Sequence, residues 1–92
     1  MNARRLRIEG VVQGVGYRAW MVRTATRLGV VGWVRNRGDG TVEAWVDGDV
    51  AAVEELLRAC RRGPAGASVT LIREELVEPE EMVGFEARAG SG

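Results

Sequence analysis

The sequence contains no histidine and no lysine, and Cys60 is the single cysteine among its 92 residues. Without histidine, the chain cannot form a Ser–His–Asp triad, a Cys–His pair or a His-ligated zinc site. Without lysine, it can form no Schiff base and lacks the lysine of a Walker-type phosphate loop. One cysteine permits neither an intrachain disulfide nor a thiolate metal cage, and it favours a reducing compartment. An enzyme of this composition must work with arginines, amides, carboxylates, hydroxyls and backbone groups.

The sequence also lacks an excess of charge of either sign, since 13 arginines balance 13 acidic residues. No global field is therefore available to attract nucleic acid or an acidic membrane. No apolar run approaches the roughly 18 residues of a membrane span, and the N-terminal arginines precede no apolar core of a secretory signal. We expect one cytoplasmic, monomeric domain over residues 1–92, with a flexible tail at about 88–92 and no nucleic-acid or membrane partner.

Hydrophobic periodicity divides the chain into five strands and two helices. Leu6 and Ile8 alternate with arginines in the first strand, and RGDG at 37–40 predicts a hairpin turn because Asp-Gly favours positive φ. The second helix has a predicted apolar face formed by Val50, Val53, Leu57 and Cys60, with Leu56 alongside. The predicted strands are 4–12, 30–36, 41–47, 68–78 and 83–89, and the predicted helices are 17–28 and 50–61.

This order, β-α-β-β-α-β plus a short fifth strand, is the ferredoxin-like split βαβ pattern of the α+β class. It predicts an antiparallel sheet with both helices on one face, a strand order of 4-1-3-2, and the fifth strand at an edge. The first two strands then run parallel and end at the same rim. Arg18 follows the first strand and Asn36 ends the second, so the topology brings them to one place.

The stretch VVQGVGYR, residues 11–18, joins the first strand to the first helix. Two glycines alone favour a simple strand-to-helix turn that needs positive φ. The stretch matches neither the dinucleotide-binding fingerprint nor the phosphate loop of nucleotide hydrolases. It nevertheless has the parts of an anion cradle: glycines that let backbone N–H groups converge, a helix N-terminus, and an arginine that can hold two phosphate oxygens.

Three stretches resemble the signatures of the acylphosphatase family. GVVQGVGYR at 10–18 resembles the first, GWVRNRGDGTVE at 32–43 resembles the second, and GPAGASV at 63–69 matches a weaker third. Tyr17 stands where the family commonly has phenylalanine, which keeps the ring and adds a hydroxyl. Together these motifs make the resemblance cover nearly the whole chain.

The resemblance implies a hydrolase that cleaves the carboxyl-phosphate bond of acyl phosphates without a metal or another cofactor. It implies that Arg18 binds the phosphate and that Asn36 orients the attacking water. Backbone N–H groups of the loop complete the substrate site, namely those of Gln13, Gly14, Val15, Gly16, Tyr17 and Arg18. The residue inventory agrees, because a carboxylate with a pKa of about 4–5 can leave without a general acid.

Other functions remain open at this point. A related reading is a carbamoyl-phosphate domain, as in larger hydrogenase-maturation proteins. A second is a module that binds a phosphorylated ligand without turnover. A third is a nucleic-acid module, since RNA-recognition domains share this layout, but they need a basic sheet with aromatic side chains on its central strands. Here the predicted central strands offer only Trp45.

Several further residues have structural interpretations. Gln13 is expected to shape the loop, and Cys60 to lie in the core. Arg35 and Arg37 flank Asn36 and either add positive potential or remain ordinary hairpin arginines. Trp33 and Trp45 are expected to form a cross-strand pair on the helix-free face or to mark a partner surface, in the segments 30–36 and 41–47.

Overall fold

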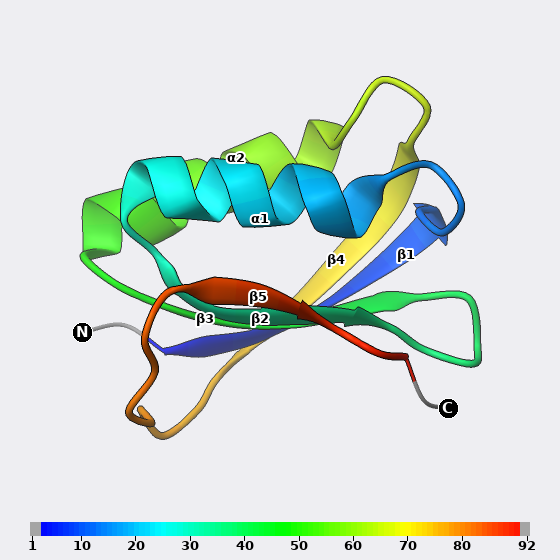
Figure 1. The fold of residues 1–92 in the computed structure, drawn as a ribbon. Coiled ribbons are helices and arrows are strands. Elements are labelled where there is room, and N and C mark those ends of the chain that lie inside the picture. Colours follow the sequence, from blue (N-terminus) through cyan, green and yellow to red (C-terminus); the bar gives the residue numbers. More distant parts are fainter. Residues whose placement is uncertain (1–2, 91–92) are drawn as a thin grey trace.

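Two helices cover one face of a five-stranded sheet in the computed structural model, which describes residues 3–90 (Figure 1). The predicted ferredoxin-like, α+β class is confirmed. In chain order the elements are β1 (Arg4–Val11), α1 (Tyr17–Leu28), β2 (Val31–Asn36), β3 (Val42–Asp47), α2 (Val50–Arg62), β4 (Ser68–Leu76) and β5 (Phe85–Arg88).

The strands lie in the order β4-β1-β3-β2-β5, as the sequence predicted. Since β3 is antiparallel to both β1 and β2, those two strands run parallel and end at the same edge. The prediction of a fully antiparallel sheet is wrong in one pairing, because β5 runs parallel to β2. β4 is antiparallel to β1 and therefore also to β2. The chain then reverses its direction between β4 and β5, so β5 runs parallel to β2.

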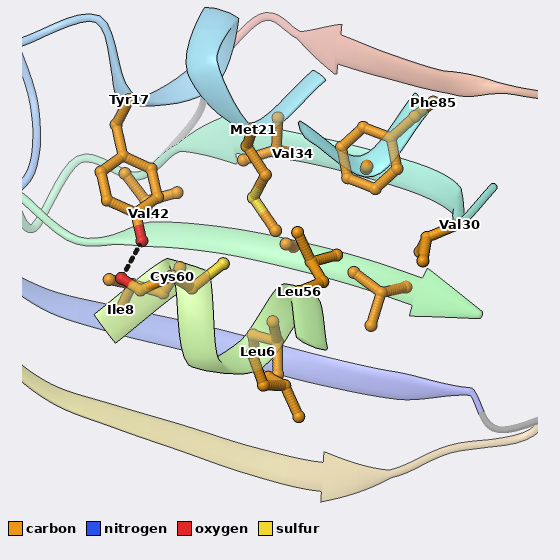
Figure 2. Close-up of a cluster of buried hydrophobic side chains, with 14 of the residues drawn as sticks. Leu6, Ile8, Tyr17, Met21, Val30, Val34, Val42, Leu56, Cys60 and Phe85 are labelled. Carbon is orange, nitrogen blue, oxygen red and sulfur yellow. Dashed lines mark hydrogen bonds between the residues drawn. The ribbon is translucent and has the colours of Figure 1, made fainter. Parts of the chain in front are cut away.

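The core lies between the sheet and the two helices, and Figure 2 shows its central side chains. Leu6 and Ile8 of β1 are fully buried, as their alternation predicted, and Met21 of α1 and Leu56 of α2 pack over them. Each such side chain contributes about 1.5–3 kcal/mol by leaving water. This packing fixes both helices on the sheet and so fixes where each helix begins.

The predicted bounds of α1 agree with the structure, and Gly29 ends it in the left-handed conformation with a φ of 76°. The predicted apolar face of α2 needs one correction, since Val50 is 58% exposed, whereas Leu56 is buried as expected. Val50 is the first residue of α2, and its side chain is not among those of the core cluster. Within residues 3–90, neither helix has the length and hydrophobicity required to span a membrane.

The last predicted strand, 83–89, is observed as the shorter β5. Arg88, the first residue of the expected tail, is still part of this strand, and residues 91–92 lie outside the described part of the chain. On the face without helices, Trp33 and Trp45 are directly opposite each other in β2 and β3, as predicted.

Candidate functional site

The glycine loop, the end of β2 and the end of β5 meet around a depression of about 380 Å³. In Figure 1 the loop between β1 and α1, the β2–β3 hairpin and the end of β5 lie on the same side of the fold. The topology therefore brings Arg18 and Asn36 together, as the parallel course of β1 and β2 predicted. The lining residues are Val12, Gly14, Gly16, Tyr17, Arg18, Ala19, Asn36 and Ala87.

The two loop glycines have a conformational role. Gly14 and Gly16 have φ angles of 75° and 78°, in the left-handed region that favours glycine. A Cβ on either would meet no atom within 4 Å, so backbone conformation rather than space requires glycine at these positions. Gly16 is the N-cap of α1, and no side chain caps the helix there. The first N–H groups of α1 consequently remain available to an anion, which the helix dipole also favours.

Arg18 is the second residue of α1 and lines the same depression as Gly14 and Gly16. Its Nη1 donates a hydrogen bond of 3.2 Å to the carbonyl oxygen of Arg88 in β5. Within residues 3–90 its guanidinium forms no ion pair with a carboxylate. The remaining N–H groups of Arg18 are therefore available to an anionic ligand, and the residue offers the fork that fits two phosphate oxygens.

Asn36 is the last residue of β2 and is half-buried. Its backbone is fixed by pairing with Val42, while its carboxamide has no hydrogen-bond partner among residues 3–90. The amide group can both donate and accept, so it can hold a water molecule at the depression that it shares with Arg18.

Gln13 and Val15 do not line the depression, unlike the other loop residues expected at the substrate. The Gln13 side chain instead crosses to the β2–β3 hairpin. Its Nε2 donates to the carbonyl oxygens of Arg37, at 2.7 Å, and Thr41, at 2.9 Å. These two residues also pair with each other through Arg37 N and Thr41 O, at 2.9 Å. Gln13 therefore ties the glycine loop to the base of the hairpin that carries Asn36.

The Tyr17 side chain belongs to the core, although the residue also lines the depression. The ring is 2% exposed and its hydroxyl donates a 2.6 Å hydrogen bond to the carbonyl oxygen of Cys60, the dashed line in Figure 2. That carbonyl is among the last four of α2, which have no helical partner. Burial, with a further effect of Cys60, raises the pKa of Tyr17 above its ordinary value. Tyr17 thus anchors the N-terminus of α1 to the C-terminus of α2.

Cys60 is a core residue, as its helical position suggested. It is fully buried, and burial raises the pKa of its thiol to about 12, although its contact with Tyr17 acts in the opposite direction. A thiol with this pKa is protonated at neutral pH and is a poor nucleophile. Among residues 3–90, no group of three cysteine or acidic side chains is arranged to hold a metal ion.

Arg35 and Arg37 do not reach the depression but converge on Glu43 of β3. Glu43 Oε1 lies 2.7 Å from Arg35 Nη2 and 3.1 Å from Arg37 Nη1, and the Glu43 residue is 5% exposed. Burial opposes ionisation of Glu43, but the hydrogen bonds and charges of both arginines outweigh it and lower its pKa. Both arginines are thus held in ion pairs outside the depression, which supports the interpretation of ordinary hairpin arginines over that of added potential at the site.

Sequence reasoning missed the contribution of β5. Ala87 lines the depression, and the carbonyl of Arg88 contacts Arg18. Gly90 lies against Asn36 so closely that a Cβ there would be 2.5 Å from the Asn36 carbonyl oxygen. No local motif in residues 85–90 marks this role, because it follows from the parallel pairing of β5 with β2.

Comparisons with known proteins agree with this geometry. A family model described as "Acylphosphatase" matches residues 4–87. The chain is 61% identical over 89 residues to a protein of Acidiphilium cryptum named "Acylphosphatase", covering 97% of this chain and 98% of the relative. A second relative of that name, from Rhodospirillum rubrum, is 55% identical over 80 residues, covering 87% and 88%.

The crystal structure of acylphosphatase from Bacillus subtilis superposes with a TM-score of 0.93 at 31% identity, covering 96% of this chain and 99% of that one. These comparisons favour turnover over a module that only binds a phosphorylated ligand or a nucleic acid. The chain belongs to the acylphosphatase family, and it is a hydrolase of acyl phosphates that acts on a phosphorus-containing acid anhydride.

Proposed function

We propose that Arg18 and the backbone N–H groups of residues 13–18 bind the phosphate of the substrate, and that Asn36 orients the attacking water. The observation that carries this proposal is the shared depression of about 380 Å³. Around this one small volume lie an uncapped helix N-terminus and the side chains of Arg18 and Asn36. Among residues 3–90, the Arg18 guanidinium forms no ion pair and the Asn36 carboxamide has no hydrogen-bond partner. These are the three elements that positioning and charge stabilisation of a phosphoryl group require.

The proposed reaction needs no protein acid. Water held by Asn36 attacks phosphorus, and the bond between phosphorus and the acyl oxygen breaks. The carboxylate takes the electron pair of that bond, and its low pKa, about 4–5, lets it leave unprotonated. A phosphate oxygen accepts the proton of the water, so the products are a carboxylate and inorganic phosphate. Arg18 and the helix N-terminus hold the charge of the phosphate throughout.

We further propose that the enzyme acts without a metal, as a cytoplasmic monomer with no nucleic-acid partner. Metal independence rests on the family resemblance and on the easy departure of a carboxylate. The cytoplasmic assignment rests on the single, buried cysteine, which favours a reducing compartment. The balance of 13 positive and 13 negative side chains argues against a nucleic-acid partner.

Hydrolysis of benzoyl phosphate tests this proposal. We expect release of phosphate that is unchanged by EDTA, and no comparable hydrolysis of an aryl phosphate, whose leaving group is a weaker one. Loss of activity in EDTA that added metal restores would overturn the metal-free reaction. Equal hydrolysis of both substrates would overturn the role of the carboxylate leaving group. Size-exclusion chromatography with light scattering tests the monomer.

A further inference from the structure

A second concave surface lies between α1 and α2, on the side of the helices that faces away from the sheet. The two helices run side by side over the sheet in Figure 1, and the groove between them has a volume of about 600 Å³. Its size is within the range of small-molecule sites. The lining residues are Trp20, Arg23, Thr24, Arg27, Glu55, Arg58, Ala59, Arg62 and Gly63.

The charge of this groove contrasts with the neutrality of the whole chain. The two helices carry six arginines and two glutamates, so they are positive while the remainder of the chain is negative. Four arginines line the groove, whereas Glu55 is the one acidic residue among its lining side chains. All four are exposed, and in the described part of the chain none forms an ion pair. The four residues are Arg23, Arg27, Arg58 and Arg62.

Helical spacing produces this arrangement. Arg23 and Arg27 are four residues apart on α1, and Arg58 and Arg62 are four apart on α2, so each helix presents a row of two guanidinium groups. Like charges at this spacing repel and destabilise a helix slightly. Four such guanidinium groups around one groove therefore cost the free protein stability, and several negative charges on one ligand would relieve the repulsion.

Trp20 gives the groove an aromatic wall at the end where Gly63 lies. Its indole is half-buried and meets the Tyr17 ring edge-on, with 5.3 Å between centroids and an angle of 62°. Tyr17 is itself held by its hydrogen bond to Cys60, and a Cβ on Gly63 would come within 2.6 Å of the Tyr17 ring. The orientation of Trp20 is thus fixed by packing, which makes it a rigid surface for a planar ring.

We propose that this groove binds a nucleoside polyphosphate, with the arginines on the phosphates and Trp20 against the base. Arginine holds phosphate oxygens through paired hydrogen bonds, and aromatic side chains stack on bases of any kind. The groove is separate from the proposed phosphate site, since none of its four arginines lines the depression that contains Arg18 and Asn36. The proposal does not depend on the mechanism assigned to that depression.

Isothermal titration calorimetry at low ionic strength, with ATP, tripolyphosphate and adenosine as probes, tests the proposal. The titrations are repeated on Arg18→Ala, so that binding in the depression around Arg18 is removed. We expect ATP still to bind Arg18→Ala, to bind this variant roughly tenfold more tightly than tripolyphosphate does, and to lose affinity as salt rises. Adenosine alone should bind far more weakly than ATP.

Two variants locate the site. Arg23→Gln/Arg58→Gln should weaken ATP binding by roughly tenfold or more. Arg61→Gln/Arg73→Gln is the matched control, because it also removes two charges, at exposed arginines that do not line the groove. Trp20→Leu should abolish the preference for ATP over tripolyphosphate. Thermal unfolding should show Arg23→Gln/Arg58→Gln as stable as the unmodified chain or more so, and its benzoyl phosphate hydrolysis should be unchanged.

Three results would overturn the proposal. One is the absence of ATP binding to Arg18→Ala at low salt. Another is equal weakening by Arg61→Gln/Arg73→Gln and by Arg23→Gln/Arg58→Gln, which would indicate a diffuse charge effect. The third is equal affinity for ATP and tripolyphosphate, which would exclude a role for the base and for Trp20.

Discussion

Arg18 Nη1 donates a 3.2 Å hydrogen bond to the carbonyl oxygen of Arg88, so the end of β5 holds the side chain proposed to bind phosphate. The contact uses one N–H group and leaves the rest of the guanidinium available. It also restricts the Arg18 side chain before substrate binds, so less conformational entropy is lost on binding. The last described residues of the chain are therefore part of the site's support.

Replacing Arg18 tests its proposed role in binding the phosphate of the substrate. We expect Arg18→Ala to abolish benzoyl phosphate hydrolysis and competitive inhibition by inorganic phosphate together. Arg18→Lys should recover only part of both, since a lysine has one ammonium group where arginine has a planar fork. Steady-state kinetics with and without added phosphate measure both quantities. Normal phosphate inhibition of Arg18→Ala would contradict the assignment.

Replacing Asn36 separates binding from turnover. Asn36→Ala should lower kcat by roughly a hundredfold or more, because a misplaced water loses its alignment with phosphorus. The inhibition constant of phosphate should stay close to that of the unmodified chain, since Arg18 and the helix N-terminus remain. If Asn36→Ala turns over at the normal rate, the water-positioning role is wrong.

Gln13 is expected to act on the reaction through Asn36. Gln13→Ala removes two hydrogen bonds to the base of the hairpin, at Arg37 and Thr41, and should cost about 1–2 kcal/mol of unfolding free energy. We expect a large fall in kcat and a smaller change in the inhibition constant of phosphate, because the hairpin carries Asn36 whereas Arg18 is on α1. Gln13→Glu should be worse, since a carboxylate would face two carbonyl oxygens. Equal losses in both quantities would point to a general distortion of the loop.

The hydroxyl of Tyr17 should contribute to stability. Tyr17→Phe removes the donor to the Cys60 carbonyl and leaves that buried acceptor unsatisfied, at a cost of about 1–3 kcal/mol. Urea denaturation followed by fluorescence measures the difference, with the denaturant slope checked for constancy. An unfolding free energy that does not change would show that the carbonyl finds another partner.

The lowered pKa of Glu43 should make the stability of the fold depend on pH. Its pKa is lower in the folded chain than in the unfolded one, so its contribution is complete above the unfolded value of roughly 4.3 and disappears as pH falls through the folded value. Glu43→Gln should cost about 1–3 kcal/mol near neutral pH, because Arg35 and Arg37 lose their charged acceptor. Denaturation curves from pH 3 to 7 should show the difference between the two proteins shrinking below about pH 4. A constant difference would contradict the assignment.

Much of the fold was predictable because periodicity is a local property. The alternation of Leu6 and Ile8 and the helical spacing of Met21 and Ala25 follow from which face of each element is buried, and all four are fully buried. The strand order then places Arg18 and Asn36 at one rim. The family motifs are contiguous stretches of residues, so they too can be recognised locally.

The interpretation of single side chains depended on tertiary structure. Gln13 and Tyr17 belong to the same loop motif, yet one braces a hairpin and the other enters the core. Such destinations depend on contacts between residues more than 20 positions apart, which no local pattern encodes. Val50 fits the helical period of α2 but is 58% exposed.

The sequence by itself excluded histidine and lysine chemistry, carried the motifs that resemble the acylphosphatase signatures, and determined the order of the elements. Tertiary structure alone decided that β5 pairs parallel with β2 and so brings Ala87 and Arg88 to the site. It also decided that the arginines of α1 and α2 share one groove. The physical reason is that periodicity reports which face of an element is buried, whereas the neighbour of each face is set by how all elements pack at once.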